Sequence, residues 1–235
     1  VGIIDASSVT AIRTAAVSGV ATRLLAREDA STLALLGSGV QARPHLDAMR
    51  AVRHRGRVQV WSPRAERREA FAAWARDHAG IEVEAVDSAE RAVADADLIC
   101  TVTSSTTPIL HDDWVAPGAH VNAVGASLPE ARELDSALVA RARLYVDRRE
   151  SAMTEAGDFL IPLREGAVTE EHILGELGDL LLERMEGRTT KSDVTLFKSL
   201  GLAIEDVAAC RWLLREAESQ GRGLVVELGG RRGDG

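Results

Sequence analysis

A short apolar run that enters a glycine-rich turn and then a helical pattern constrains this chain most. Residues 32–36 lead into Gly37-Ser38-Gly39-Val40-Gln41-Ala42, which has the spacing G-x-G-x-x-A. Gly37 permits a tight turn, Gly39 lets backbone amides approach a pyrophosphate, and Ala42 lets the helix pack closely on the strand. The pattern predicts a dinucleotide at the helix N-terminus, bound by Gly37, Gly39, Val40 and Gln41. The alternative is an ordinary glycine-rich turn with no nucleotide.

Apolar runs alternate with amphipathic helical patterns up to residue 146. Nearly continuous apolar strands separated by such helices are typical of a parallel sheet covered on both faces. The predicted fold class is therefore α/β, with a Rossmann-like doubly wound parallel sheet. We expect strands at 32–36, 57–61, 81–84, 97–102, 119–124 and 143–146. We expect helices at 8–27, 40–53, 64–79, 88–94 and 135–142, the first of them capped by Ser7 or Ser8.

The pattern after residue 147 is helical throughout. It predicts helices at about 150–165, 169–186 and 192–219, with no strand among them. The glycine-rich tail that follows has no regular pattern.

The end of the second predicted strand indicates which dinucleotide is bound. An acidic residue there binds the ribose hydroxyls of NAD, whereas basic or hydroxyl residues accommodate the 2′-phosphate of NADP. The run Trp61-Ser62-Pro63-Arg64 has no carboxylate. Ser62 and Arg64, supported by Arg67 or Arg68, therefore favour NADP, with NAD still possible. The alternative is that these arginines are only the solvated face of a helix.

Two further runs follow strands at the edge where the crevice of such folds lies. Thr103 and Ser104 follow the fourth strand and suit a ribose or a second phosphate. Val124, Gly125 and Ala126 follow the fifth strand, on the expected nicotinamide side, where a glycine permits close approach of the ring. A loop role alone is the alternative for both runs.

Charge and hydropathy exclude some classes of partner. The 28 Lys and Arg against 36 Asp and Glu give a net charge of −8, which disfavours nucleic acid. No apolar run reaches the length of a membrane span, and the first residues lack the pattern of a signal peptide, so we expect no membrane partner and a cytoplasmic location. The histidines and cysteines show no metal-ligand spacing, so no metal site is predicted.

Five segments together resemble the ornithine cyclodeaminase and μ-crystallin family of nicotinamide-dependent enzymes. They are VTAIRTAAVSG at 9–19, ALLGSGVQA at 34–42, ADADLICTVTSS at 94–105, HVNAVGAS at 120–127 and TLFKSLGLAIEDVAA at 195–209. The resemblance implies a homodimer, with a Rossmann domain beside a helical remnant of a second domain. We thus expect a helix of the substrate and dimerisation domain at 1–28, the Rossmann domain with trailing helices at 29–190, and a helix returning to the substrate domain, then a tail, at 191–235.

The chain departs from the family in its length. The resemblance implies roughly a hundred further residues before Val1, which would supply most of the substrate-domain sheet. We therefore expect a fragment or truncated form that binds cofactor but is impaired in catalysis.

The resemblance assigns roles to residues near both ends of the chain. It implies that Arg13 holds the carboxylate of the substrate, that Thr14 lies near the cofactor, and that Ser199 and Leu200 stand close to the nicotinamide and substrate at the head of the last helix. Arg13 also shares a helical stripe with apolar residues, and a cation on a buried face needs an anionic partner. A structural salt bridge to an internal acid is the alternative. Lys198 could be a charge partner beside this pair, although a solvated lysine is the commoner outcome.

Ser127 separates the chemistries within the family. The resemblance implies an aspartate here in the ornithine cyclodeaminases, and a serine is a poor general base near neutral pH. The run Gly125-Ala126-Ser127-Leu128-Pro129 instead resembles the ketimine reductase branch. We therefore expect NAD(P)-dependent hydride transfer to or from the C=N or amine carbon of a small amino or imino acid, with Ser127 as the catalytic candidate. The alternatives are ornithine cyclodeaminase and a non-catalytic NADPH- or ligand-binding protein.

Overall fold

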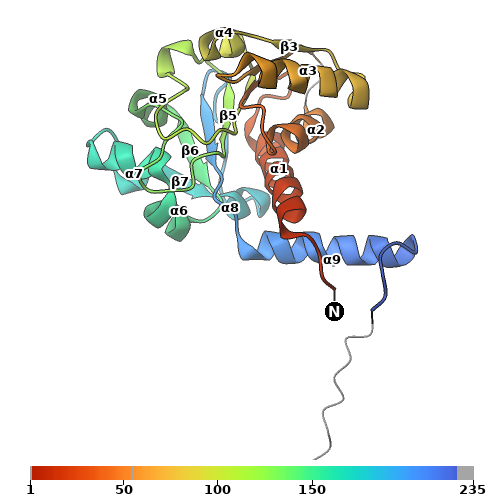
Figure 1. Ribbon diagram of the computed structural model, residues 1–235. Coiled ribbons are helices and arrows are strands. Elements are labelled where there is room, and N and C mark those ends of the chain that lie inside the picture. Colours follow the sequence, from red (N-terminus) through yellow and green to blue (C-terminus); the bar gives the residue numbers. More distant parts are fainter. Residues whose placement is uncertain (1, 54–55, 227–235) are drawn as a thin grey trace, which may run out of the picture.

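One sheet of eight parallel strands organises the computed structural model, which describes residues 2–53 and 56–226 (Figure 1). The strand order is β3-β2-β1-β4-β5-β8-β6-β7, and all seven pairings are parallel. In chain order the strands are β1 (Leu33–Leu36), β2 (Val58–Trp61), β3 (Val83–Ala85), β4 (Leu98–Thr101), β5 (His120–Ala123), β6 (Arg143–Val146), β7 (Ile173–Glu176) and β8 (Thr195–Lys198). This confirms the predicted doubly wound α/β sheet.

The direction of the strand order reverses between β1 and β4. From β1 the chain steps outward to β2 and β3, then returns to place β4 on the other side of β1. The connection that follows β1 continues into α2 (Ala42–Val52) on one face of the sheet, whereas the connection that follows β4 passes over the other face through η1 (Asp112–Trp114). A crevice opens between them at the carboxyl ends of the strands, which is where such folds bind their ligands.

Helices cover both faces of the sheet. They are α1 (Ala6–Leu25), α2 (Ala42–Val52), α3 (Ala65–Ala79), α4 (Ala89–Val93), α5 (Ser136–Arg141), α6 (Arg149–Glu155), α7 (Gly157–Arg164), α8 (Leu177–Leu181) and α9 (Ala203–Ser219), with 3₁₀ turns η1 (Asp112–Trp114) and η2 (Glu170–His172). One buried cluster packs helices α4, α5, α6 and α7 against one face of the sheet. Two others join α2 and α3, and α1 and α8, with the opposite face. Residues of β1 and β4 alternate between these clusters, and every residue of β1, β4, β5 and β8 is buried, as expected for strands covered on both faces.

Helix α1 lies on the sheet by its C-terminal half. Its residues Ala21 and Leu25 are fully buried with Tyr145 and Phe197. The helix begins at Ala6, because Asp5 accepts a hydrogen bond from the Ser8 amide and caps it in place of the predicted serines. Whether α1 belongs to a separate domain, as the division at residue 28 predicts, stays a prediction.

The prediction that the chain is helical throughout after residue 147 is wrong. Strand β7 interrupts the segment predicted as helix 169–186, and β8 occupies the start of the segment predicted as helix 192–219. Both strands have only four residues, and their mixture of apolar and polar side chains is too short to show a period that separates a strand from a helix. The predicted helix 150–165 is divided at Ala156 into α6 and α7.

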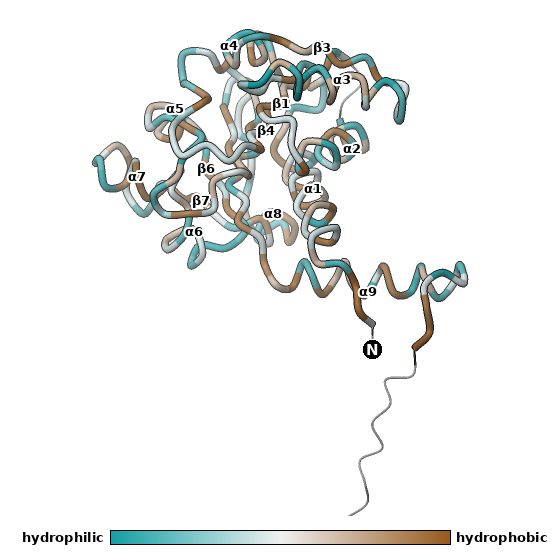
Figure 2. The backbone as a smooth tube through the Cα atoms, in the orientation of Figure 1, coloured by the Kyte–Doolittle hydropathy of each residue, from teal (hydrophilic) through white to brown (hydrophobic). Residues whose placement is uncertain are grey.

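Helix α9 extends away from the sheet (Figure 1). None of its residues is buried. Figure 2 colours brown the apolar segments directly before and after the helix. The predicted C-terminal tail lies largely outside the described residues. Within residues 2–53 and 56–226, none of the helices combines the length and hydropathy of a membrane span.

Candidate dinucleotide and substrate site

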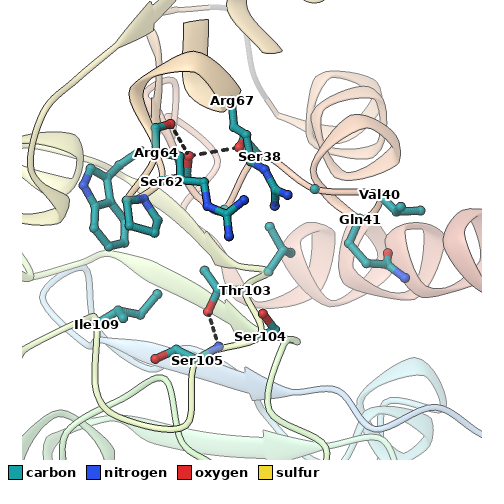
Figure 3. A pocket seen from close by; sticks show the side chains of 15 residues that line it. Ser38, Val40, Gln41, Ser62, Arg64, Arg67, Thr103, Ser104, Ser105 and Ile109 are labelled. Carbon is teal, nitrogen blue, oxygen red and sulfur yellow. Dashed lines mark hydrogen bonds between the residues drawn. The ribbon is translucent and has the colours of Figure 1, made fainter. Parts of the chain in front are cut away.

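A cavity of about 620 Å³ opens at the carboxyl ends of β1, β2 and β4 (Figure 3). Its lining includes the predicted cofactor-binding residues Gly37, Gly39, Val40, Gln41, Ser62, Arg64, Thr103 and Ser104. The other lining residues are Ser38, Trp61, Pro63, Arg67, Val102, Ser105 and Ile109. Of the described residues that line the cavity, none is acidic. Its size and its wall of hydroxyls, arginines and backbone amides are suited to an anionic, elongated ligand.

The two glycines of the turn meet different surroundings. Gly37 has a φ of +119°, and a Cβ added there would lie 2.7 Å from the carbonyl oxygen of Val102. Gly39 is exposed, and a Cβ added there would meet nothing within 4 Å. The first glycine is therefore required by the fold, whereas the second leaves open space in front of the turn. This open space lies at the start of α2, beside the buried Gln41 Oε1, which has no partner among the described residues.

Positive charge gathers beyond the end of β2. Figure 3 shows the side chains of Arg64 and Arg67 at the cavity, and no described carboxylate pairs with either of them. Ser62 is 5% exposed, and its hydroxyl accepts a hydrogen bond from Ser38 Oγ at 3.0 Å. Arg68 instead donates to the Ser62 carbonyl oxygen at 3.1 Å, which braces the loop. Two unpaired guanidiniums and a fixed hydroxyl make this corner suited to a phosphate group.

The residues predicted on the nicotinamide side follow β5 and β8. Val124 and Ala126 are buried, Gly125 is half-buried and Ser127 is exposed. They lie outside the cavity lining described above, one strand further along the sheet. Beside them, the Ser199 amide donates to the Ala123 carbonyl oxygen at 3.0 Å, which brings the two predicted segments together.

Ser199 and Leu200 follow β8 rather than opening the last helix, which begins at Ala203. The buried Ser199 hydroxyl has no hydrogen-bond partner among the described residues. The amides of Leu200 and Gly201 donate to Asp147 Oδ2 at 2.6 and 2.5 Å. These bonds hold the segment in an extended turn at the edge of the sheet that carries the cavity.

Arg13 lies at the same edge. A Cβ added to Gly201 would lie 2.2 Å from Arg13 Nη1, so the guanidinium packs against the turn that follows Leu200. Glu205 and Asp206 of α9 pair with it at 3.0 and 3.1 Å. The structure thus shows the internal salt bridge that was the alternative for Arg13. Thr14, its neighbour, is buried and lies outside the cavity lining.

The expectation of a solvated Lys198 is wrong. Its side chain is 1% exposed, and its Nζ lies 3.1 Å from Asp158 Oδ2. Asp158 also accepts hydrogen bonds from the amides of Glu133 and Leu134. The buried Glu133 carboxylate next to this pair was missed by the sequence analysis. No local pattern marks it, because its partners lie 8 to 32 residues away along the chain.

Glu133 lies between the ends of β4 and β5 and accepts hydrogen bonds from both. Burial, together with the nearby Asp158 carboxylate, raises the pKa of Glu133 above its usual range. The hydrogen bonds from Thr101 and Thr103 act in the opposite direction, since they stabilise the charged form.

The sheet, the glycine turn and the cavity at the strand-order reversal define a Rossmann-type dinucleotide-binding protein. The model of the "Ornithine cyclodeaminase/mu-crystallin family" matches residues 1–221, and the chain belongs to this family. The family resemblance predicted from the sequence is thereby confirmed.

Three known proteins illustrate the similarity. A Delta(1)-pyrroline-2-carboxylate reductase of Bacillus cereus is 36% identical over 227 residues, covering 96% of this chain and 70% of the relative. The ketimine reductase mu-crystallin of Mus musculus is 41% identical over 220 residues, covering 94% of this chain and 66% of that protein. The structure of Thermococcus litoralis Delta(1)-pyrroline-2-carboxylate reductase in complex with NADH and L-proline matches with a TM-score of 0.90. It is 38% identical and covers 93% of this chain and 68% of that one.

Proposed function

We propose that this protein is an NAD(P)-dependent oxidoreductase that acts on the C=N or amine carbon of a small amino or imino acid. The observation that carries the proposal is the cavity at the strand-order reversal, with its open Gly39, in a chain of this family. Bound nicotinamide would supply the hydride donor or acceptor. The relatives that reduce pyrroline carboxylate and ketimines support this class of substrate.

The cofactor would lie across the carboxyl ends of the strands. Backbone amides at Gly39, Val40 and Gln41 would hold the pyrophosphate, because the α2 N-terminus faces open space there. The hydroxyls of Thr103 and Ser104 would bind the ribose beside it. The nicotinamide half would then reach the residues that follow β5 and β8, namely Val124, Gly125, Ala126 and Ser199 on the predicted ring side.

Arg13 would bind the carboxylate of the substrate at the exit of β8. The guanidinium is held there by Glu205 and Asp206 and packs on the turn after Leu200, while Thr14 lies next to it on α1. A guanidinium has five donors, so a carboxylate ligand could be added to these two ion pairs. Fixing the carboxylate would place the adjacent imine carbon toward the nicotinamide side.

Ser127 favours a reductase over a cyclodeaminase. The residue is exposed and has no hydrogen-bond partner among the described residues, so nothing there activates its hydroxyl as a base. Its hydroxyl can donate or accept a hydrogen bond at the substrate nitrogen.

NADP is the proposed form of the cofactor. Arg64 and Arg67 have no described acidic partner, and no acidic side chain lines the cavity where NAD would require one. The Thermococcus relative was solved with NADH, so the corner beyond β2 is where we expect this chain to differ in preference.

The cofactor proposal is tested by titrating the chain with NADPH and NADH and following nucleotide fluorescence. We expect tighter binding of NADPH. Arg64→Ala should weaken NADPH binding by about ten- to a hundredfold, the effect of a lost charge-assisted bond, and leave NADH binding nearly unchanged. Arg50→Ala, an exposed arginine on α2 without a described carboxylate partner, is the control. Equal affinity for both dinucleotides would exclude NADP preference.

The activity is tested by NADPH oxidation with Δ1-pyrroline-2-carboxylate, a cyclic imine with an adjacent carboxylate. We expect slow substrate-dependent oxidation, since the chain spans about 70% of the length of its reductase relative, and we expect Arg13→Ala to abolish it. Ammonia release from ornithine without cofactor turnover would show a cyclodeaminase instead. Retention of NADPH and the imine without any turnover would show a binding protein.

A homodimer is the proposed assembly. Helix α9 exposes Ile204, Val207 and Trp212, each by 59% or more. An apolar surface of this kind on a charged chain is typical of a protein contact.

A further inference from the structure

A single buried carboxylate connects the two loops that follow β4 and β5. Glu133 is fully buried, and both of its oxygens accept two hydrogen bonds. Oε1 accepts from the Thr103 amide at 2.7 Å and from Thr103 Oγ1 at 2.6 Å. Oε2 accepts from Thr101 Oγ1 at 2.7 Å and from the Gly125 amide at 2.7 Å. One side chain therefore fixes the backbone of both loops at once.

The two loops are in direct contact at this point. A Cβ added to Gly125 would lie 2.1 Å from the Thr103 carbonyl oxygen and 2.5 Å from Glu133 Oε1. Because no side chain fits at Gly125, the spacing of the loops is set by their backbones and by the carboxylate between them. A shift of Glu133 would move both loops.

Two further buried charges hold the second loop from its other side. The Glu133 amide donates to Asp158 Oδ1 at 2.7 Å, and Asp158 Oδ2 pairs with Lys198 Nζ at 3.1 Å. Lys198 Nζ in turn donates to the Ala126 carbonyl oxygen at 2.5 Å and to that of Ala123 at 3.3 Å. Gly125 is thus held by its amide and Ala126 by its carbonyl, while the next residue, Ser127, remains exposed.

Stability alone does not account for this arrangement. Buried ion pairs are often no more stabilising than apolar residues of similar volume, because the charges lose their hydration. A carboxylate with four donors, however, fixes direction as well as distance, which packing of apolar side chains does not.

We propose that Glu133 is a positioning residue, braced by Asp158 and Lys198, that sets the Thr103 and Gly125 loops at the spacing required by the nicotinamide half of the cofactor. This inference rests on the proposed function. It assigns to Glu133 no contact with the cofactor or the substrate, and its effect passes through the two loops.

The first test is amide hydrogen exchange in the chain without cofactor. Glu133→Gln keeps the shape of the side chain but replaces one acceptor oxygen by a donor. We expect exchange at the amide of either Thr103 or Gly125 to accelerate about tenfold or more, because one of the two loops loses its acceptor. Glu130→Gln, an exposed glutamate three residues earlier without a described polar partner, should leave exchange unchanged. Unchanged exchange in Glu133→Gln would overturn the proposal.

The second test separates positioning from loss of folded protein. With Δ1-pyrroline-2-carboxylate and NADPH, Glu133→Gln should lower kcat about ten- to a hundredfold and raise the isotope effect on kcat with NADPH deuterated at the transferred position. A merely structural role would reduce the active fraction and leave the isotope effect and KM unchanged, which would overturn the proposal.

A second variant keeps the test decisive if Glu133→Gln does not fold. Thr101→Val removes one donor to Oε2 and conserves shape, and we expect a smaller change of the same sign in exchange at Gly125. If the wild-type chain does not oxidise NADPH, the proposed activity fails. The role of Glu133 is then decided by amide exchange at the two loops and by the NADPH affinity of the variants. If both are the same in the variants as in wild type, the proposed role of Glu133 is overturned.

Discussion

Gly37 and Gly39 belong to one motif but serve different requirements. Gly37 combines a left-handed φ with direct contact to the backbone after β4, so the fold itself excludes a side chain. Gly39 has open space before it, so only a ligand could exclude one. The spacing G-x-G-x-x-A does not distinguish these requirements, whereas the structure does.

Alanine substitutions should separate the two glycines. Gly37→Ala should lower the free energy of unfolding by about 1–3 kcal/mol, because the new Cβ meets Val102 and the backbone is strained. Gly39→Ala should leave the thermal midpoint nearly unchanged yet weaken NADPH binding about tenfold or more, since its Cβ occupies the space for the pyrophosphate. Thermal unfolding followed by circular dichroism and fluorescence titration measure the two effects. Tight NADPH binding by Gly39→Ala would contradict the placement of the pyrophosphate.

A buried histidine links the glycine turn after β1 to helix α1, which carries Arg13. His45 Nδ1 lies 2.7 Å from the Gln41 carbonyl oxygen, which can only accept, so this nitrogen carries the proton. Nε2 then accepts from Ser18 Oγ of α1 at 3.0 Å. Burial lowers the pKa of His45 to about 4, so the imidazole is neutral in the folded protein near neutral pH.

Stability should therefore decrease in mild acid. An unfolded histidine has a pKa of about 6.5, so between there and about 4 the unfolded chain binds more protons than the folded one. The free energy of unfolding should fall by about 2 kcal/mol for His45 between pH 7.5 and pH 5. The buried His120, whose pKa burial lowers to about 3, should add a similar loss.

Urea unfolding at the two pH values measures this effect. His45→Gln should reduce the pH dependence by about 2 kcal/mol, while His78→Gln, an exposed histidine on α3, should not change it. The same pH dependence in wild type and His45→Gln would contradict a neutral His45 in the folded protein.

At the scale of the element, the sequence predicted the first six strands well and the last two not at all. Each of the first strands is separated from the next by a helix or a clear turn, so the alternation is visible. Strand β8, in contrast, has four buried residues directly before the turn and helix α9. Its strand character comes from β5 and β6 on either side, which contribute nothing to the local pattern.

The site was predictable where it follows visible strands. The turn after β1, Ser62 and Arg64 after β2, and Thr103 and Ser104 after β4 were found from position alone, and all line the cavity. Glu133 and Lys198 were not, because their roles depend on partners brought together only by the sheet. The resemblance, rather than periodicity, pointed to Ser199 and Leu200.

The ion pairs of Arg13 hold the start of helix α9 on α1. No residue of α9 is buried, while Glu205 and Asp206 both pair with that guanidinium. Arg13→Gln should accelerate amide exchange over 203–215 about tenfold and leave β4 and β5 unchanged. Arg23→Gln, on the same helix and without a described carboxylate partner, is the control. Uniform acceleration across the sheet would show that Arg13 supports the whole fold instead.

At the scale of the whole molecule, we expect the exposed apolar face of α9 to form the contact of the proposed homodimer. Ile204, Val207 and Leu214 recur on one side of the helix and are exposed. Sedimentation velocity at micromolar concentration should show a dimer, and Val207→Asp should shift it to the monomer because the charge would be buried in the contact. Leu182→Asp, at a site of similar exposure after α8, should remain dimeric. A monomeric wild-type chain would contradict the proposed homodimer.

The place of β8 in the sheet has a consequence for how the protein is made. During synthesis, β5 emerges about 75 residues before the strand that pairs with it, and β6 about 50 residues before. Until Thr195–Lys198 leaves the ribosome, the nascent chain carries two half-sheets, each with an open inner edge that can pair with other chains. The insertion of this strand joins the halves and buries Lys198 in one event. A ribosome that stalls before Thr195 would therefore release a product with two exposed strand edges, which cellular chaperones and proteases would recognise.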